Sequence, residues 1–460
     1  MDLLLLAIAL LVLLAAGFGI ALLALPERRL GVGETFAMAF LFGCAFVSLA
    51  SFCLGFFFAG GLLRGASTAA CLVIAALGLR ARREGLRELV WPRFERRLDQ
   101  WSLLVVSAQM MVVTLACYYI WLGWDALLIW EFKARIAFLN GGALPLDYYP
   151  NPNGIWPHTS YPLLLPLTEA WFYGWLGRPD QALAKLLFPL FYLAALALLG
   201  TGVARFGQRR HAWPAMAALF LVPLAWLGEG SASSGYADFP LAVFQLAAVL
   251  YLLEYWEQDT AGALRTMSAA AAALIWVKQE GVILWSCLAL LAAIRALQRR
   301  EPRELCLALL PGALLFGLWR LFLDVVAAPR WTDFQRTPLR TLFASANLAM
   351  EIGRGVGSEF LRLNRFGVLW PGFLGALVLQ LRGPLRPARA ILSLSVLLPI
   401  VCYSGVYLFS NWGSVSSHIA SSFSRLLLHV APSALLLIVL SMPAPFRRKE
   451  TRASRLEQKN

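Results

Sequence analysis

Long apolar runs separated by short polar segments dominate this chain. Three runs, 3–25, 35–58 and 62–79, precede an arginine-rich segment, and a fourth follows it at 101–122. Roughly 20 apolar residues are enough to cross the hydrocarbon core of a bilayer. Such runs form helices, because backbone groups in lipid must be hydrogen-bonded within the segment. The alternation of a membrane β-barrel is missing. The pattern therefore predicts an all-α polytopic membrane protein.

The hydropathy pattern predicts about 13 transmembrane helices, with the N-terminus outside and the C-terminus inside. The block 162–176 is short and contains Pro166 and Glu169, which favours a helix at the interface, and further amphipathic interfacial helices are expected in the outer loops. The predicted crossings are 3–25, 35–58, 62–79, 101–122, 182–204, 212–227, 239–253, 267–277, 282–294, 305–325, 367–380, 390–409 and 425–440.

Charge fixes the orientation of these helices. The segment 80–100 holds seven arginines against four acidic residues, and the tail 447–460 holds six basic residues against two acidic ones. Basic loops stay in the cytoplasm, so both segments are assigned there. With 60% hydrophobic and 14% charged residues, the chain has no soluble domain that could present a basic face to nucleic acid. The first run lacks a basic leader and a small-residue cleavage site, which favours a retained helix. A bacterial inner membrane is the expected location.

Polar segments that the cytoplasmic charge does not explain all fall on the outer side. They are 124–161, 229–238, 278–281, 326–366 and 410–425. A shared cavity facing outwards is the simplest explanation. The chain is divided into three parts: 1–100 with the first helices and a basic loop, 101–442 with the outer loops 123–161 and 326–366, and the basic tail 443–460; the resemblance given below implies that 101–442 is a catalytic module.

Asp125 is the first candidate for chemistry, because a charge at a membrane boundary is costly unless it is paired or hydrated. It follows the outgoing run 101–122 and Trp124 directly. Its carboxylate could cap the N-terminus of the next helix. It could also act as a general base towards a hydroxyl or amine acceptor. Both interpretations stay open, and Asp238 is the second carboxylate that could assist.

The rest of this loop offers several ligands for a substrate. Glu131 and Arg135 are four residues apart, so they could simply pair on one helix face. Lys133 points elsewhere on that helix and is the better candidate for a phosphate oxygen. His158 is either a hydrogen-bonded loop residue or a substrate ligand, and Tyr161 closes the same element.

A lipid phosphate at the outer face would need cations there, against the positive-inside tendency. Loop 326–366 has six arginines against three acidic residues. Arginine forks bind phosphate oxygens bidentately. The alternative is that these arginines contact anionic headgroups or local acids. Lys278 could bind phosphate or pair with Glu280. The substrate-binding candidates chosen from these segments are Arg336, Arg340, Lys278, Glu280 and Arg425, with the cations among them as phosphate ligands.

No metal site is indicated by spacing. The seven cysteines form no CxxC pair, and the four histidines are scattered. A divalent cation held by Asp125 and Asp238 stays open.

The order of these motifs resembles the GT-C glycosyltransferases, with the aminoarabinose transferases and protein O-mannosyltransferases as the nearer relatives. The resemblance covers roughly residues 101–442. It rests on Asp125 after an outgoing helix, a later Lys or Arg, the Gly141-Gly142 pair, and His158 through Pro162 entering the next helix. Further matches are the segments 233–242, 278–281 and 421–428.

The resemblance implies transfer of a sugar from a polyprenyl-phosphate donor to an acceptor outside the membrane, with Asp125 where the family has its acceptor-activating aspartate. Trp124 stands where the family has a second acidic residue, and Tyr161-Pro162 replaces its Pro-Pro, so the acceptor could be a glycan, a lipid or a protein. Two other classes are weighed. A transporter or flippase of a lipid-linked substrate would favour repeats and broken helices at mid-membrane. An inactive scaffold would tolerate loss of both aspartates.

Overall fold

The computed structural model describes residues 1–26, 31–82, 90, 96–151, 158–329, 334, 346–382 and 386–442. Within these residues every regular element is helical, and the only β pairing consists of two isolated bridges, Gly31 with Val90 and Phe334 with Ser410. The all-α class predicted from the apolar runs is confirmed. The chain is helical because lipid offers no hydrogen bonds, and a helix pairs the N–H and C=O groups of its own backbone.

The long helices follow the apolar runs closely. They are α1 (Asp2–Ala24), α2 (Val32–Leu54), α3 (Gly60–Ala81), α4 (Arg97–Tyr119), α8 (Leu187–Phe206), α11 (Asp238–Gln258), α12 (Ala261–Val277), α13 (Gly281–Arg299), α14 (Pro302–Val325), α19 (Pro387–Val406) and α20 (Val415–Ser441). The shorter ones are η2 (Ala126–Glu131), α5 (Phe132–Leu139), α6 (Leu164–Leu176), α7 (Gln181–Ala184), α9 (Ala212–Ala218), α10 (Pro223–Trp226), α16 (Ala346–Phe360), α17 (Leu363–Phe366) and α18 (Leu369–Leu381).

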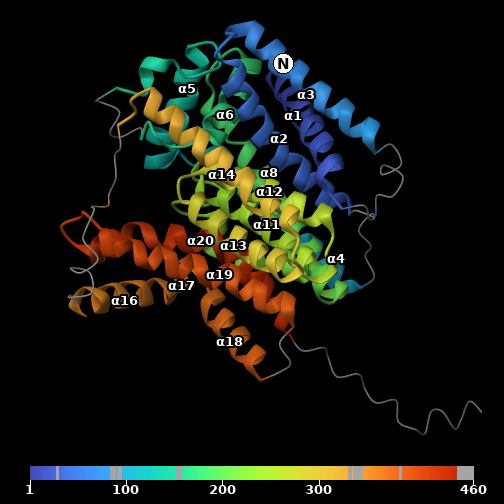
Figure 1. Ribbon diagram of the computed structural model, residues 1–460, viewed down its shortest axis with the longest axis vertical. Helices are drawn as coiled ribbons and strands as arrows, with labels where there is room; N and C mark the ends of the chain where they lie inside the picture. The colour runs from blue at the N-terminus through green and yellow to red at the C-terminus, as the bar shows by residue number, and fades with distance from the viewer. Residues whose placement is uncertain are drawn as a thin grey trace, which may run out of the picture.

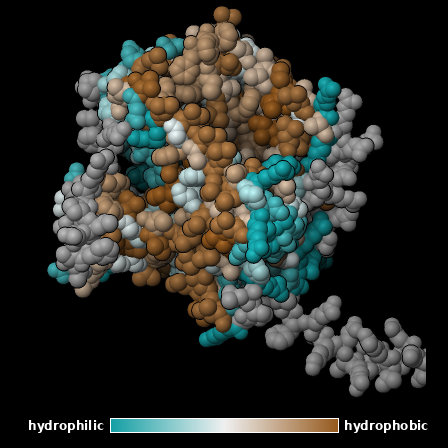
Figure 2. Space-filling view, viewed as in Figure 1, coloured by the Kyte–Doolittle hydropathy of each residue, from teal (hydrophilic) through white to brown (hydrophobic). Residues whose placement is uncertain are grey.

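Ten of the described helices are long and apolar enough to cross a membrane, α7 and α8 together counting as one, and α12 and α18 are shorter apolar helices. The predicted crossing 212–227 is not one continuous helix, because it breaks into α9, a 3₁₀ turn and α10 at Val222-Pro223. Proline lacks the N–H that would continue the helix. A multi-pass membrane protein is supported, and the count of 13 stays a prediction. Figure 2 shows a broad hydrophobic surface between hydrophilic margins at the left and right.

The loops gather at two opposite ends of the bundle. At one, called here the loop end, the Gly60 N–H donates to the Gly141 carbonyl over 2.7 Å, and the Gly123 N–H donates to the Ser234 carbonyl over 3.1 Å. α5 and α16 lie at this end, at the left of Figure 1. The helix α16 packs against α20. The loop end therefore holds described residues of the polar segments that the sequence placed on one side.

The basic turns lie at the other end, which is called here the arginine end. Arg82 donates to the Leu25 carbonyl over 2.9 Å. Arg295 forms an ion pair of 2.9 Å with Asp259. Arginines therefore fasten several helix termini to one another here.

Helices α1–α3 are packed into the bundle rather than appended to it. They lie on one flank in Figure 1, with α16–α20 on the opposite flank. α2 packs on α6 and α8, and α1 packs on α6 and α12. The α1–α2 contact is close enough that a Cβ at Gly17 would lie 1.7 Å from the Ala39 carbonyl oxygen. Small residues permit such backbone approach between helices in lipid.

Candidate functional site

Five of the predicted site residues meet at the loop end, although up to 300 residues separate them in the chain. Asp125 precedes the π-helical turn η2, and Asp238 begins α11. Lys278 and Glu280 lie in the turn between α12 and α13, and Arg425 projects from α20. Together with His429 of α20 they are called the site cluster below. A π-helical turn beside such a cluster is a frequent feature of functional sites.

Asp125 and Arg425 form the exposed part of the site cluster. The Arg425 guanidinium donates to the Asp125 carboxylate, and the two side chains are 20% and 26% exposed. Arg425 also lies over the Tyr236 ring, 5.5 Å from its centroid, and the Tyr236 hydroxyl accepts a 3.2 Å hydrogen bond from the Asp125 N–H. The Asp125 side chain makes no capping hydrogen bond. The capping interpretation is therefore wrong, because the carboxylate is turned to Arg425 instead.

Asp238 forms the buried part. Its side chain is fully buried, and its Oδ1 accepts hydrogen bonds from Lys278 Nζ over 2.8 Å and from the His429 ring over 2.9 Å. The other ring nitrogen of His429 lies 3.1 Å from the Tyr403 hydroxyl. A neutral imidazole with its proton on Nε2 satisfies both contacts, since Nδ1 then accepts from the tyrosine. Asp238 thus fixes the positions of a lysine and a histidine.

The turn between α12 and α13 supplies Lys278 and Glu280 as a second ion pair, 2.9 Å apart. Gly281 makes this turn possible, because a Cβ there would lie 1.9 Å from the Leu274 carbonyl oxygen. Burial lowers the pKa of Lys278, but the charges of Asp238 and Glu280 outweigh burial and raise it overall. Burial raises the pKa of Glu280, and the Lys278 charge outweighs it, so the net pKa is lowered. Lys278 and Glu280 are therefore a charged pair, and the predicted pairing is confirmed.

Three polar atoms of the site cluster are buried without a hydrogen-bond partner among the described residues. They are Asp238 Oδ2, Glu280 Oε2 and Arg425 Nε. An unsatisfied buried polar group costs stability, and each one calls for an explanation such as a water, an ion or a ligand. Here they lie behind an ion pair that is partly open to solvent, so the cluster has unused donors and acceptors in its interior, next to an exposed edge.

The remaining described candidates belong to loop 123–161 and form a neighbouring group. Lys133 is 0% exposed, and its ammonium donates to the His158 carbonyl over 2.9 Å. The Trp130 and Tyr161 rings lie 5.5 Å from the same nitrogen. Burial lowers the pKa of Lys133 well below its usual value. The assignment of Lys133 to a phosphate oxygen is not supported, because the side chain points into the protein.

Arg135 and Glu131 form the i, i+4 ion pair that the sequence allowed, 3.1 Å apart. The Tyr173 hydroxyl also donates to Glu131 over 3.2 Å. His158 has φ +44 and stacks on Tyr161 with centroids 4.8 Å apart. These contacts support the structural alternatives for Arg135 and His158.

The two groups adjoin each other. Gln279, between Lys278 and Glu280, donates to the Ser160 hydroxyl over 3.3 Å. Arg336 and Arg340 lie outside the described residues. From the same loop, Phe334 pairs with Ser410 and stacks on the His418 ring, 5.4 Å between centroids.

Sequence reasoning missed His429, Tyr403 and Tyr236. A signal for His429 existed, because it follows Arg425 by four residues in an apolar helix and so lies on the same face. Tyr403 gave no signal, since a tyrosine in an apolar helix is ordinary. Within the described residues, no group of three or more His, Cys, Asp or Glu side chains is arranged to hold a metal ion. Asp125 and Asp238 each face a cation of the protein.

No family model, curated protein or solved structure matches this chain.

Proposed function

We propose that this protein is a GT-C-type glycosyltransferase, which moves a sugar from a polyprenyl-phosphate donor to an acceptor at the outer face of a bacterial inner membrane. The observation that carries the proposal is the partly exposed Asp125–Arg425 pair at the end of a membrane-embedded bundle, backed by a buried set of charged side chains. This arrangement offers a base and a phosphate ligand side by side. Carboxylate and guanidinium are the groups that such a transfer needs.

In the proposed reaction, Asp125 takes the proton from the acceptor hydroxyl or amine as the acceptor attacks the anomeric carbon. A new glycosidic bond forms, and the bond between the anomeric carbon and the phosphate oxygen breaks. The electron pair leaves with polyprenyl phosphate, and the configuration inverts. Direct displacement needs one carboxylate at the acceptor and stabilisation of charge on the leaving oxygen.

Arg425 is proposed to bind the donor phosphate. Its Nε has no partner among the described residues, and its guanidinium lies on the exposed side of the site cluster. An arginine fork has five donors, so one guanidinium can hold Asp125 and a phosphate oxygen together. Such sharing brings the leaving group close to the base.

Asp238 is proposed as a positioning residue, because its carboxylate is fully buried. Through its contacts with Lys278 and His429 it fixes the turn before α13 and the middle of α20. Arg425 is one helical turn from His429, so this framework holds the proposed phosphate ligand in place.

The test is release of polyprenyl phosphate from a polyprenyl-phosphate sugar by the full chain in liposomes, with a mixture of cell-envelope acceptors. Asp125→Asn is expected to reduce release by about 10²–10⁴-fold, the usual contribution of a general base. Asp147→Asn, at an exposed acid of the same loop, is the matched control and is expected to keep full activity. Undiminished release by Asp125→Asn would refute the assignment of the base. If the wild-type chain transported the lipid-linked sugar across the membrane but released polyprenyl phosphate from no sugar donor, the flippase class would be favoured.

A further inference from the structure

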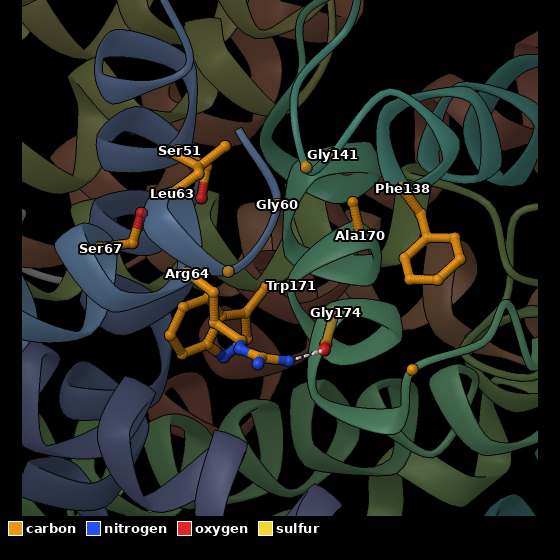
Figure 3. A pocket seen from close by; sticks show the side chains of 13 residues that line it. Ser51, Gly60, Leu63, Arg64, Ser67, Phe138, Gly141, Ala170, Trp171 and Gly174 are labelled. Atoms are coloured by element: carbon orange, nitrogen blue, oxygen red, sulfur yellow. Dashed lines mark hydrogen bonds between the residues drawn. The ribbon is translucent and has the colours of Figure 1, made fainter. Parts of the chain in front are cut away.

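A pocket lies away from the site cluster, where α3 meets α6 and the end of α5. Its volume is about 250 Å³. Figure 3 shows Ser51 and Ser67 on one side, Phe138 on the other and Arg64 at the lower edge. It is called here the α3 pocket. Glycines of α3, α6 and the turn after α5 line much of the wall and leave room between the helices.

Arg64 is the charged residue of this wall. Its guanidinium donates to the Gly174 carbonyl and lies 5.7 Å from the centroid of the Trp175 ring. Among the described residues that line the pocket there is no acidic side chain. One guanidinium without an opposing carboxylate makes the pocket electropositive and suited to an anion.

The N-terminus of α3 adds donors to the same wall. Gly60 donates its N–H to Gly141, but the N–H groups of Gly61, which lines the pocket, and of Leu62, which does not, have no backbone acceptor among the described residues. The helix has 22 residues, and the free N–H groups and dipole of a helix N-terminus attract negative charge.

Ser67 provides the second, independent indication of a ligand. The side chain is 1% exposed, lines the pocket, and its Oγ has no hydrogen-bond partner within the described part of the chain. Neighbouring Thr68, by contrast, bonds its hydroxyl to the Arg64 carbonyl of its own helix. Ser67 follows Arg64 by one turn on the same helix face, about 5 Å deeper along α3. A hydroxyl left unbonded at this depth is suited to the oxygen of a bound molecule.

The outer surface of α3 is apolar and exposed. Leu62, Val73 and Leu77 are 73%, 58% and 53% exposed, in a helix that is a candidate membrane span. Bilayer lipid is the medium that meets such a surface. The α3 pocket therefore lies on a helix whose outer surface contacts lipid.

We propose that the α3 pocket binds one anionic glycerophospholipid of the membrane. The phosphate lies at Arg64 and the free N–H groups of α3, and the Ser67 hydroxyl donates to an ester carbonyl oxygen one turn deeper. The acyl chains continue along the apolar face of α3. The ester contact is the reason to choose a glycerophospholipid over a polyisoprenyl phosphate, which has a phosphate but no ester carbonyl. The site is separate from the donor site proposed above and does not depend on it.

The test is native mass spectrometry of the full chain in detergent, delipidated and titrated with phosphatidylglycerol. One molecule is expected to bind tightly to the wild type. Arg64→Gln is expected to weaken binding about tenfold, the effect of losing one charge-assisted contact. Ser67→Val is expected to weaken it by a smaller factor, and Thr68→Val is the matched control that leaves it unchanged.

A pair of glycines separates loss of binding from loss of folding. A Cβ added at Gly174 or at Gly65 meets nothing within 4 Å, but only Gly174 lines the pocket. Gly174→Leu is therefore expected to abolish the bound lipid, whereas Gly65→Leu keeps it, with both variants melting near the wild-type temperature. Unchanged phosphatidylglycerol binding by Gly174→Leu would overturn the proposal. Preferential binding of a polyisoprenyl phosphate in the same titration would also overturn it, and would make the pocket part of the donor site.

Discussion

Two buried ionic clusters hold this bundle, and they differ in how completely they are satisfied. At the arginine end, Arg205 bonds to Glu34 over 2.5 Å and to Glu254 over 2.6 Å, and the Tyr251 hydroxyl donates to Glu34 over 2.5 Å. These four residues are called the Arg205 cluster. None of their side-chain atoms is among the buried, unpartnered atoms of the described chain.

The site cluster has the opposite character. It keeps three unpartnered buried atoms and an ion pair that is 20% to 26% exposed. Burying charge is expensive, and a pair that only stabilises a fold is expected to satisfy every donor and acceptor. A cluster with unused hydrogen-bonding capacity and an exposed edge is better suited to a ligand. The comparison therefore separates a structural cluster from a candidate site within one molecule.

The largest combined loss of stability and transfer is expected from Asp238→Asn. The neutral side chain no longer balances Lys278, and loss of one partner of a buried pair costs about 3–5 kcal/mol. Because His429 and Lys278 would shift, transfer is also expected to fall, by about 100-fold, as a misplacement of 1 Å can cause. Thermal melting followed by tryptophan fluorescence, together with the release assay, measures both.

A double variant distinguishes positioning from mere stability. Asp238→Asn with Lys278→Met removes both charges of the Asp238–Lys278 pair but leaves Glu280, which is 24% exposed, without its lysine, so only part of the lost stability is expected to return. Transfer is expected to stay low, since the framework around Arg425 is still absent. Recovery of transfer together with stability would remove the distinction between the two clusters.

Arg205→Gln is the corresponding change in the Arg205 cluster. It removes the guanidinium that Glu34 and Glu254 share, and a loss of about 3–5 kcal/mol is expected. Sugar transfer per folded molecule is expected to stay within about twofold of wild type, because the effects of substitutions at Arg205 and in the site cluster are independent. Arg209→Gln, at an exposed arginine four residues on, is the control for charge at this end. A large loss of transfer by folded Arg205→Gln would show that the two clusters are coupled.

The sequence predicted the membrane architecture well and the site partly. Hydropathy located the long helices because lipid requires long apolar segments, and it failed at 212–227, where Pro223 interrupts an apolar run. It also grouped Asp125, Asp238, Lys278 and Arg425 on one side, since charge bias fixes which loops share a side.

Pairing could not be predicted in the same way. That Arg425 meets Asp125, or that His429 meets Asp238, depends on how α20 packs against η2 and α11, which are far away in the chain. Lys133 shows the limit most clearly. On a helical wheel it looked available to a substrate, yet the turn at His158 folds over it and its carbonyl accepts a hydrogen bond from the Lys133 ammonium. Helix periodicity predicts which residues share one face of a helix. The residues that this face contacts depend on the tertiary structure.

Glu169 extends the comparison to a buried acid that has no ion pair among the described residues. Burial, aided by the charge of Glu131, raises its pKa well above 4.5, and the charge of Lys185 opposes this only in part. The folded chain therefore keeps a proton that the unfolded chain releases, so stability falls as pH rises from about 4.5 towards the raised pKa. Glu169→Gln removes this penalty. A gain of about 2–4 °C in melting temperature, equivalent to ~1 kcal/mol, is expected at pH 8 and a smaller one at pH 5. Asp147→Asn is the control, and an equal gain at both pH values would contradict the assignment.

The smallest effect is expected from Arg135→Gln, which removes the exposed partner of an i, i+4 ion pair. Arg135 is 44% exposed, whereas Glu131 is buried and keeps its hydrogen bond from the Tyr173 hydroxyl. Helical i, i+4 pairs contribute about 0.5 kcal/mol, and salt screens the exposed partner. The variant is expected to melt within about 2 °C of wild type. The small difference is expected to vanish in 1 M NaCl, where the screening length is only about 3 Å. Its KM for the lipid-linked donor is expected to be unchanged, because the guanidinium is turned to Glu131 and away from the Asp125–Arg425 pair. A raised KM with unchanged stability would contradict this and move Arg135 from the structural group into the donor site, as the sequence alone had allowed.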